Sequence, residues 1–469
     1  MAVNLISNTK IKGIARIPDA NAPLPPGAAL FADFSGYRFV MKYATGQVKR
    51  GASLKEVISF LRSSPATRIG PSGLIEYLMV DEPAIEYHPV THECLGIRAE
   101  SVSNNRIAWS QDFTQAASWT PSGVTLTAND VKSPDGNTTA TKLIETAGGS
   151  AVTHTLEAIA TIAAVVGSPY TFSIWAKANT GSVLQIAAQG AVATTQYVNF
   201  DLKNGKIGKT SPQILQATMQ EFTNGYYRCA ITITPTVAAN PRFTLALTGG
   251  DSSAAAIPAY IPSTPGSVYI WGAQPERRDG ASSYIPTNGA EASRAADICT
   301  TPTDYDGVSS MAGTIMVTCV HPHSNQSISE KYNALACATV LDNSVAGASL
   351  RLSYRNLSNP NVNNGRAQWA TADAAGVSQS LEIYSMNPVR DSEQAAIFSF
   401  DKVTMTMKLF DGFNWYSMPV TSLPDALNRI CVGRSYIGPE NWFNGYIKKL
   451  IYWPQALTER QMEDIISYN

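Results

Sequence analysis

The stretch Tyr170-Thr171-Phe172-Ser173-Ile174-Trp175-Ala176-Lys177 alternates between two kinds of side chain. Successive residues of a β-strand point to opposite faces. One face therefore carries Tyr170, Phe172, Ile174 and Ala176, and the other carries Thr171, Ser173, Trp175 and Lys177. This period predicts a strand that buries its apolar face in a core and turns a polar face, with one Trp, the other way.

Three further segments in the middle of the chain alternate in the same way, at residues 196–202, 227–234 and 243–247. Turn-forming sequences lie between the strands, at residues 134–137, 203–206 and 223–226. Short alternating strands separated by regular turns are typical of antiparallel sandwiches. We therefore predict a β-sandwich over residues 104–300.

A second series of strand-like segments begins near residue 307 and includes residues 313–320, 395–400, 403–410 and 443–452, with a turn at Asp411-Gly412. A helix is predicted at residues 456–466, because Thr458 can cap its first turn and Gln461 occupies the capping-box position. These features predict a second β-sandwich over residues 307–469. The predicted fold class is mainly β, with two antiparallel, jelly-roll-like sandwiches in tandem behind a mixed N-terminal segment.

Residues 1–63 have a different pattern. The sequence Ala22-Pro23-Leu24-Pro25-Pro26-Gly27 predicts a stiff, polyproline-like connector. Apolar residues at positions 54, 57, 58 and 61 have helical spacing, which predicts a short helix over residues 53–62 with Ser53 as N-cap. Such a segment suits attachment to another protein, or the helix packs on the chain's own sandwich. Residues 64–103 are expected to connect it to the first sandwich.

Bulk composition disfavours several classes of protein. The chain has 469 residues, of which 15% are charged, and its net charge is −1. A nucleic-acid-binding protein needs a basic field, so that class is disfavoured. The N-terminus lacks the pattern of a signal peptide, and no apolar run approaches the roughly 18 residues of a membrane span. The six cysteines have irregular spacing and lie mostly in apolar segments, which predicts buried thiols and fits assembly in a reducing cytoplasm.

Several phrases resemble a known family in their order and spacing. The middle stretch opens with residues 105–113 and Trp119, and it closes with residues 272–276, 283–287 and 294–297. This resembles the carbohydrate-binding-like β-sandwich of tail fibres, tail spikes and head fibres of tailed phages. The upstream phrases at residues 65–69, 73–76, 88–91 and 95–100 resemble the lead-in to that module, and residues 443–466 resemble the close of laminin-G/concanavalin-like lectin folds.

Sequence patterns of common catalytic or nucleotide-binding sites, such as GxGxxG, HExxH and Gly-x-Ser-x-Gly, do not occur, and no cofactor is expected. In His321-Pro322-His323 both imidazoles could reach one side of a strand, and three copies could then share a metal on a three-fold axis. Pro322 disturbs a strand, so His321 and His323 stay weak candidates and no metal is predicted. Asp401, Asp411 and Glu440 lie near turns, which favours turn capping over the paired acids of glycoside hydrolysis.

Aromatic side chains are the remaining signal, because sugars stack on Trp and Tyr while polar neighbours bind their hydroxyl groups. Trp175 lies among polar residues of its strand, and Trp271 lies on the face opposite Val268 and Ile270. In the second sandwich, Trp415, Tyr416 and Trp442 lie beside turns. These five residues are the candidates for glycan binding, and packing against a neighbouring domain or subunit is the alternative.

The resemblance implies a non-enzymatic structural subunit of a phage appendage, assembled in the host cytoplasm and displayed on the virion surface. It would be a homotrimer that binds other virion proteins through residues 1–63 and host-surface glycans through its sandwiches, with linked copies supplying avidity. Two alternatives stay open. One is a decoration or cementing protein that binds no glycan, and the other is a polysaccharide-degrading tail spike.

Overall fold

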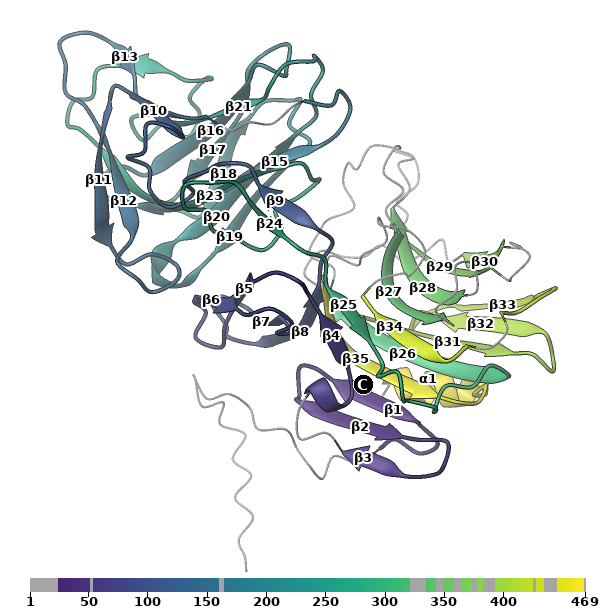
Figure 1. Cartoon of the computed structure of the whole chain (residues 1–469). Coiled ribbons are helices and arrows are strands. Elements are labelled where there is room, and N and C mark those ends of the chain that lie inside the picture. Colours follow the sequence, from purple (N-terminus) through teal and green to yellow (C-terminus); the bar gives the residue numbers. More distant parts are fainter. Residues whose placement is uncertain are drawn as a thin grey trace, which may run out of the picture.

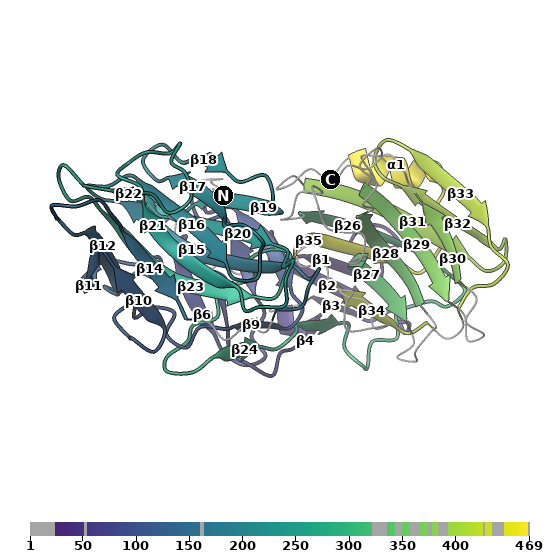
Figure 2. The same ribbon diagram turned by 90° about the horizontal axis from the view of Figure 1, so that it is seen from above.

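The computed structural model describes residues 24–50, 54–159, 164–320, 335–342, 349–356, 365–372, 378–382, 393–424, 427–433 and 445–467. In these ranges the chain forms antiparallel β-sheets almost throughout, with one α-helix and two 3-10 helices of three residues each. The prediction of a mainly β fold with antiparallel sandwiches is confirmed. Figures 1 and 2 show two β-rich bodies side by side, with a smaller layer of hairpins between them.

One body, here called the terminal sandwich, is built from both ends of the described chain. Its larger sheet has the order β3 (Val48–Arg50), β2 (Arg38–Lys42), β1 (Leu30–Asp33), β35 (Gly445–Trp453), β26 (Ala312–Val320), β31 (Glu393–Asp401), β32 (Thr406–Phe410) and β33 (Trp415–Pro419). Strand β8 (Cys94–Ala99) also pairs with β35, and β7 (Ile85–Tyr87) pairs with β8. The facing sheet has the order β30 (Ser378–Glu382), β29 (Gly365–Ala372), β28 (Ser349–Asn356), β27 (Leu335–Asp342), β34 (Arg429–Val432), β25 (Ile298–Thr300) and β4 (Ser59–Leu61).

Strand β1 is an internal strand of the terminal sandwich. It pairs with β2 on one side and with β35 on the other, with Phe31 opposite Ile451. Leu30 and Phe39 lie in the same buried cluster as Ile315 and Leu450. The structure therefore differs from the expected separate segment over residues 1–63 and independent module over residues 307–469, since their strands share one core.

The helix expected over residues 53–62 is replaced by a single 3-10 turn, Leu54–Glu56, and by strand β4. Leu54, Val57 and Ile58 are buried in the core of the terminal sandwich, as the apolar spacing predicted, whereas Leu61, the fourth residue of that spacing, is 50% exposed. Strand β4 pairs with β25, with Phe60 opposite Cys299. The 3-10 turn and the strand pairing therefore bury Leu54, Val57 and Ile58 without forming an α-helix.

Helix α1 (Glu459–Ser467) covers the outer face of the larger sheet, as expected for the end of the second module. Met462 packs with Phe31, Met316 and Ile451 in a second buried layer. The backbone N–H of Thr458 donates to Oε1 of Gln461 at 2.9 Å, and the N–H of Gln461 donates to Oγ1 of Thr458 at 3.3 Å. The predicted capping box is confirmed.

We expect Thr458→Ala to lower the free energy of unfolding by about 0.5–2 kcal/mol, because the first turn of α1 loses a side-chain acceptor. Urea unfolding monitored by circular dichroism measures the effect. Asp464→Ala, an exposed change on the same helix, is the matched control and should change stability by only a few tenths of a kcal/mol, as roughly expected for surface positions. Equal losses in the two variants would contradict a capping role for Thr458.

The other body, here called the inserted sandwich, consists of two six-stranded sheets. The first has the order β10 (Trp119–Ser122), β14 (Thr155–Ala158), β21 (Arg242–Leu247), β16 (Val183–Gln189), β17 (Gln196–Asp201) and β18 (Lys206–Thr210). The second has the order β11 (Val124–Val131), β12 (Ala140–Glu145), β23 (Ser267–Glu276), β15 (Tyr170–Ala178), β20 (Tyr227–Ile233) and β19 (Gln216–Glu221).

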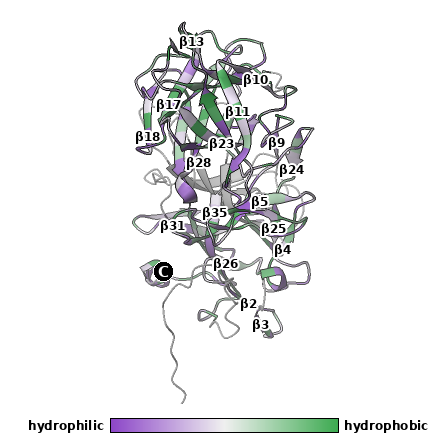
Figure 3. Cartoon of the chain, turned by 90° about the vertical axis from the view of Figure 1, so that its left-hand side faces the viewer, coloured by the Kyte–Doolittle hydropathy of each residue, from purple (hydrophilic) through white to green (hydrophobic). Residues whose placement is uncertain are grey.

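The alternation at residues 170–177 separates a core-facing side of strand β15 from its other side, as the sequence predicted. Tyr170, Phe172 and Ile174 lie in the core between the two six-stranded sheets. Figure 3 shows apolar (green) stretches on strands of this sandwich, including β23. The other face of β15, with Thr171, Ser173 and Trp175, is also buried, because further parts of the chain cover it.

The inserted sandwich interrupts the terminal sandwich in the chain. The chain enters through β9 (Ser103–Asn105) and returns through β24 (Ala292–Arg294), and these two strands pair with each other. The backbone N–H of Asp297 donates to the carbonyl of Glu100 at 2.9 Å, just outside this ribbon. The sandwiches are thus nested, whereas the sequence analysis expected them in tandem.

Two small two-stranded sheets complete the described fold, of which only the β5–β6 pair is a hairpin. β5 (Ala66–Ile69) pairs with β6 (Ile75–Leu78), and β13 (Val152–Thr153) pairs with β22 (Ala259–Tyr260). The β5–β6 hairpin lies against the inserted sandwich, where Ile75 contacts a buried aromatic cluster. The side chains of Cys94, Cys229, Cys299, Cys319 and Cys431 are buried thiols, as predicted for them.

Candidate functional site

A cavity of about 440 Å³ lies where the inserted sandwich, the β5–β6 hairpin and the terminal sandwich meet. We call it the junction pocket. Its floor is the outer face of strands β15, β20 and β19. Its walls are strands β5 to β8, here called the lead-in strands, and residues 280–284. Val320 of β26 and Tyr446 of β35 line it from the terminal sandwich. Three parts of the fold therefore form one site.

The floor of the pocket is polar because of the strand register. Gln216, Thr218 and Gln220 of β19 stand opposite Thr232, Ala230 and Arg228 of β20. The latter three stand opposite Thr171, Ser173 and Trp175 of β15. The intervening residues of β20, such as Cys229 and Ile231, point into the core. Alternation therefore places hydroxyl, amide and guanidinium groups together on this outer face.

Arg228 is the cation of the floor. Its Nη2 donates to Oγ of Ser173 at 3.0 Å, and its guanidinium carbon lies 4.4 Å from the centre of the Trp175 ring. Burial lowers the pKa of Arg228 more than the attraction of Glu276 and Glu100 raises it, but an arginine stays charged at neutral pH. Its Nε has no hydrogen-bond partner among the residues that the structure describes. Within the described part of the chain, Arg228 forms no ion pair with a carboxylate.

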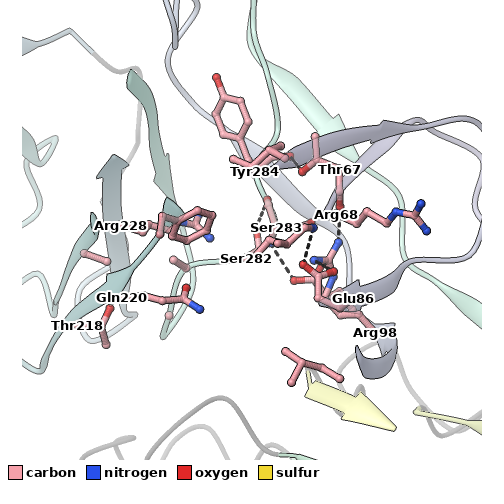
Figure 4. A pocket seen from close by; sticks show the side chains of 18 of the residues that line it. Thr67, Arg68, Glu86, Arg98, Thr218, Gln220, Arg228, Ser282, Ser283 and Tyr284 are labelled. Atoms are coloured by element: carbon pink, nitrogen blue, oxygen red, sulfur yellow. Dashed lines mark hydrogen bonds and ion pairs between the residues drawn. The ribbon is translucent and has the colours of Figure 1, made fainter. Parts of the chain in front are cut away.

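The opposite wall contains a buried network of charges. Arg98 lies 2.5 Å from Glu86 and 3.0 Å from Glu100. Arg294 lies 3.5 Å from Glu100 and 3.6 Å from Asp297, which also pairs with Arg62. Figure 4 shows Arg228 and Gln220 on one side of the pocket, Glu86 and Arg98 on the other, and Ser282 and Ser283 between them. The network ties the lead-in strands to the ribbon of the inserted sandwich.

The two acids of this wall have different environments. Burial raises the pKa of Glu86 to about 7. Burial also opposes ionisation of Glu100, but Arg294 and Arg98 outweigh it and hold the pKa of Glu100 well below its ordinary value. Glu86 accepts a hydrogen bond from the backbone N–H of Ile69 at 2.8 Å, and Glu100 accepts one from the N–H of Ser283 at 3.0 Å. Both carboxylates are therefore engaged in holding the wall together.

We expect the Glu100 contribution to stability to disappear in acid. The pKa of Glu100 is lower in the folded chain than in the unfolded one, so its contribution is present above pH 4.5 and is lost as the pH falls below that value. The melting temperature should fall between pH about 5 and about 3, and it should fall less in Glu100→Gln. Parallel pH profiles of the wild type and this variant would argue against Glu100 as a source of the acid sensitivity.

The structure buries the two tryptophans that the sequence analysis assigned to the polar face. Trp175 is 1% exposed and Trp271 is fully buried. Both lie in a cluster with Phe222, Tyr226 and Tyr284, and Ile75 of the β5–β6 hairpin covers it. Neither ring offers a free face for stacking with a sugar, which favours the packing alternative. Nε1 of Trp271 donates to Thr139 at 3.0 Å, whereas Nε1 of Trp175, which lines the pocket, has no hydrogen-bond partner in the described ranges.

The candidates of the second sandwich lie apart from the pocket. Trp415 is half-buried against Phe410, with ring centres 4.6 Å apart, and its Nε1 donates to Glu463 of α1 at 2.7 Å. Tyr416 packs partly against the core of the terminal sandwich. Asp401 and Asp411 accept hydrogen bonds from backbone N–H groups of their own turns. Trp442, Glu440, His321 and His323 lie outside the described residues.

Sequence reasoning missed Arg228 as a site residue. A signal for it was present, because Arg228, Ala230 and Thr232 alternate with Cys229, Ile231 and Ile233. That period places Arg228 on the outer face of β20.

The sequence also led us to expect no metal site and no membrane span. In the ranges that the structure describes, no group of three or more His, Cys, Asp or Glu residues could hold a metal ion, and no helix has the length and apolar character needed to cross a membrane.

No protein-family model and no curated protein matches the sequence. Solved structures give weak likenesses. A carbohydrate-binding module (CBM40) of the Ruminococcus gnavus IT-sialidase, bound to α2,3-sialyllactose, matches with a TM-score of 0.27 and 11% identity, over 34% of this chain and 83% of that one. Domains LG4-5 of the mouse laminin α1 chain match with a TM-score of 0.24 and 10% identity, over 75% of this chain and 94% of that one. At these scores neither likeness carries an argument about function.

Proposed function

We propose that this chain is a structural subunit of a tailed-phage virion appendage and that its junction pocket binds host-surface glycan. The observation that carries the proposal is the set of unsatisfied polar atoms in the pocket. Nε1 of Trp175, Oγ of Ser283 and Nε of Arg228 are buried and have no hydrogen-bond partner among the described residues. Leaving such groups unpaired costs free energy, so a polar ligand would gain by pairing with them.

The chemistry of the pocket suits a sugar. Its volume of about 440 Å³ lies within the range of small-molecule sites. Thr218 and Gln220 reach the cavity from an edge strand and are partly or fully exposed, so they can exchange water for sugar hydroxyl groups. The aromatic cluster below Trp175 keeps the floor rigid. A rigid polar pocket reduces the ordering cost of binding.

The appendage role rests on the phrases within residues 60–298 that resemble phage modules, while residues 443–466 resemble the close of laminin-G/concanavalin-like lectin folds. In such a protein, weak binding by single pockets becomes strong when linked copies, such as those of a homotrimer, engage one surface. Residues 30–61 belong to the terminal sandwich. A virion contact near the N-terminus would then involve the surface of this sandwich or residues that precede β1.

Binding of the purified full-length chain to a glycan array tests the proposal. We expect binding to a small set of bacterial surface glycans, and we expect the polysaccharide to stay intact, without a halo on a host lawn. Absence of binding by a multivalent preparation would favour a decorating or cementing role. Depolymerisation of a bound glycan would favour an enzyme.

A further inference from the structure

Arg228 differs from the other arginines that line the junction pocket. Arg98 pairs with Glu86 and Glu100, and Arg68 pairs with Glu76 at 2.9 Å. Among the residues that the structure describes, Arg228 has only the hydroxyl of Ser173 as a hydrogen-bond acceptor and the ring of Trp175 as a stacking partner. A guanidinium group carries five N–H donors in a planar fork, and carboxylate is the anion that matches this fork. In the described part of the chain, the floor of the pocket therefore holds a cation without a carboxylate counter-ion.

We infer that the junction pocket recognises a carboxylate-bearing sugar, with the carboxylate on Arg228 and the ring hydroxyl groups on neighbouring polar side chains. The inference rests on the proposed glycan binding and specifies the class of glycan. Gln220 stands directly opposite Arg228 in the strand pairing, and Ser283 on the facing wall has a buried hydroxyl that pairs with no described residue. Together they place a guanidinium, an amide and a hydroxyl around one space, as Figure 4 shows.

The surroundings of Arg228 favour a sugar over an acidic peptide. The residues beside it on the floor, Thr218, Gln220 and Thr232, offer hydroxyl and amide groups, which suit several hydroxyl partners of one ring. A peptide with a run of acidic residues would need further unpaired cations. The other described arginines that line the pocket are already paired with carboxylates. One carboxylate on a hydroxyl-rich ring matches this arrangement.

Titration of the full-length chain with paired oligosaccharides tests the inference. The probes are oligosaccharides ending in a hexuronate or a nonulosonate, each beside its carboxyl-reduced form, which keeps the ring but loses the charge. We expect reduction of the carboxyl group to weaken binding by about 10- to 100-fold, the effect of one charge-assisted hydrogen-bonded pair. This comparison uses only the wild-type protein, so it does not depend on the folding of a variant.

Arg228→Gln should weaken binding of the acidic form by a similar factor and leave binding of the reduced form nearly unchanged. Arg228→Lys should fall between, since it keeps the charge but loses the fork. The matched control is Arg242→Gln, which removes the same charge from an exposed position on β21, in the other sheet of the same sandwich. Melting curves confirm that each variant is folded.

The outcomes separate the inference from the proposed function. If both forms of a glycan bind equally well to the wild type, the inference is wrong and glycan binding stands. If no oligosaccharide binds, the proposed function fails and the inference fails with it. Displacement of a bound acidic sugar by neutral sugars alone, or preferential binding of an acidic peptide, would also overturn the inference.

Discussion

A fragment of residues 298–467 should fail to fold alone, whereas a fragment of residues 103–294 should unfold cooperatively. The first fragment lacks β1, β2, β4, β7 and β8, which belong to the sheets of the terminal sandwich. Without them the core lacks Leu30, Phe39 and Phe60. The edge of β35 that normally pairs with β1 is then exposed to solvent. The second fragment keeps both of its sheets and its core complete.

Urea unfolding followed by circular dichroism and tryptophan fluorescence measures both fragments. The full-length chain is the control, and joining residues 24–99 to residues 298–467 through a short linker should restore the transition of the terminal sandwich. A cooperative transition in the isolated fragment of residues 298–467, at the urea concentration found for the full-length chain, would falsify the shared core.

Arg98→Met should destabilise the chain by about 3–5 kcal/mol, because it leaves Glu86 buried without its cation and Glu100 with Arg294 but without Arg98. The loss should be larger at pH 8 than at pH 5, since burial disfavours the charged form of Glu86 and raising the pH forces that carboxyl to ionise. Equilibrium urea unfolding at the two pH values measures the difference.

Arg106→Met is the matched control for this change. Arg106 pairs with Glu291 at 3.0 Å, but both side chains are exposed by more than a third. Surface pairs of this kind contribute roughly 0–1 kcal/mol. If the two variants lost the same small amount of stability, the buried network would not hold the junction together.

The strands and turns of this chain were predictable where local pattern decides them. Residues 170–177 and 227–234 alternate, and their apolar sides form the core of the inserted sandwich. The capping residues Thr458 and Gln461 likewise act within one turn of helix. Such features depend on neighbouring residues alone, so one sequence is enough to find them.

Pairing between distant strands was not predictable in this way. Strand β1 pairs with β35, and β4 pairs with β25, across long separations in the sequence. The apolar residues at 54, 57 and 58 are buried as expected, but pairing of β4 overrides the helical spacing. Nothing local in residues 30–61 distinguishes a strand of a distant sandwich from an attachment segment.

The candidate site was only partly predictable for the same reason. Alternation placed Trp175 on the correct face of its strand, opposite the core. It could not indicate that the β5–β6 hairpin and Tyr284 cover that face. The pocket arises where three parts of the chain meet, so its members, including Arg228 and Ser283, come together only in the folded protein.

The most direct test of glycan binding through the junction pocket is a host-cell binding titration with a pocket-filling variant. Thr218 faces the pocket from edge strand β19, so Thr218→Trp should fill the space without disturbing a core. Thr210→Trp adds the same ring at an exposed position of β18, in the other sheet, and serves as the control. We expect the wild type and Thr210→Trp to bind host cells equally and Thr218→Trp to lose binding while keeping its melting temperature. Equal binding by all three folded proteins would contradict a role for the pocket.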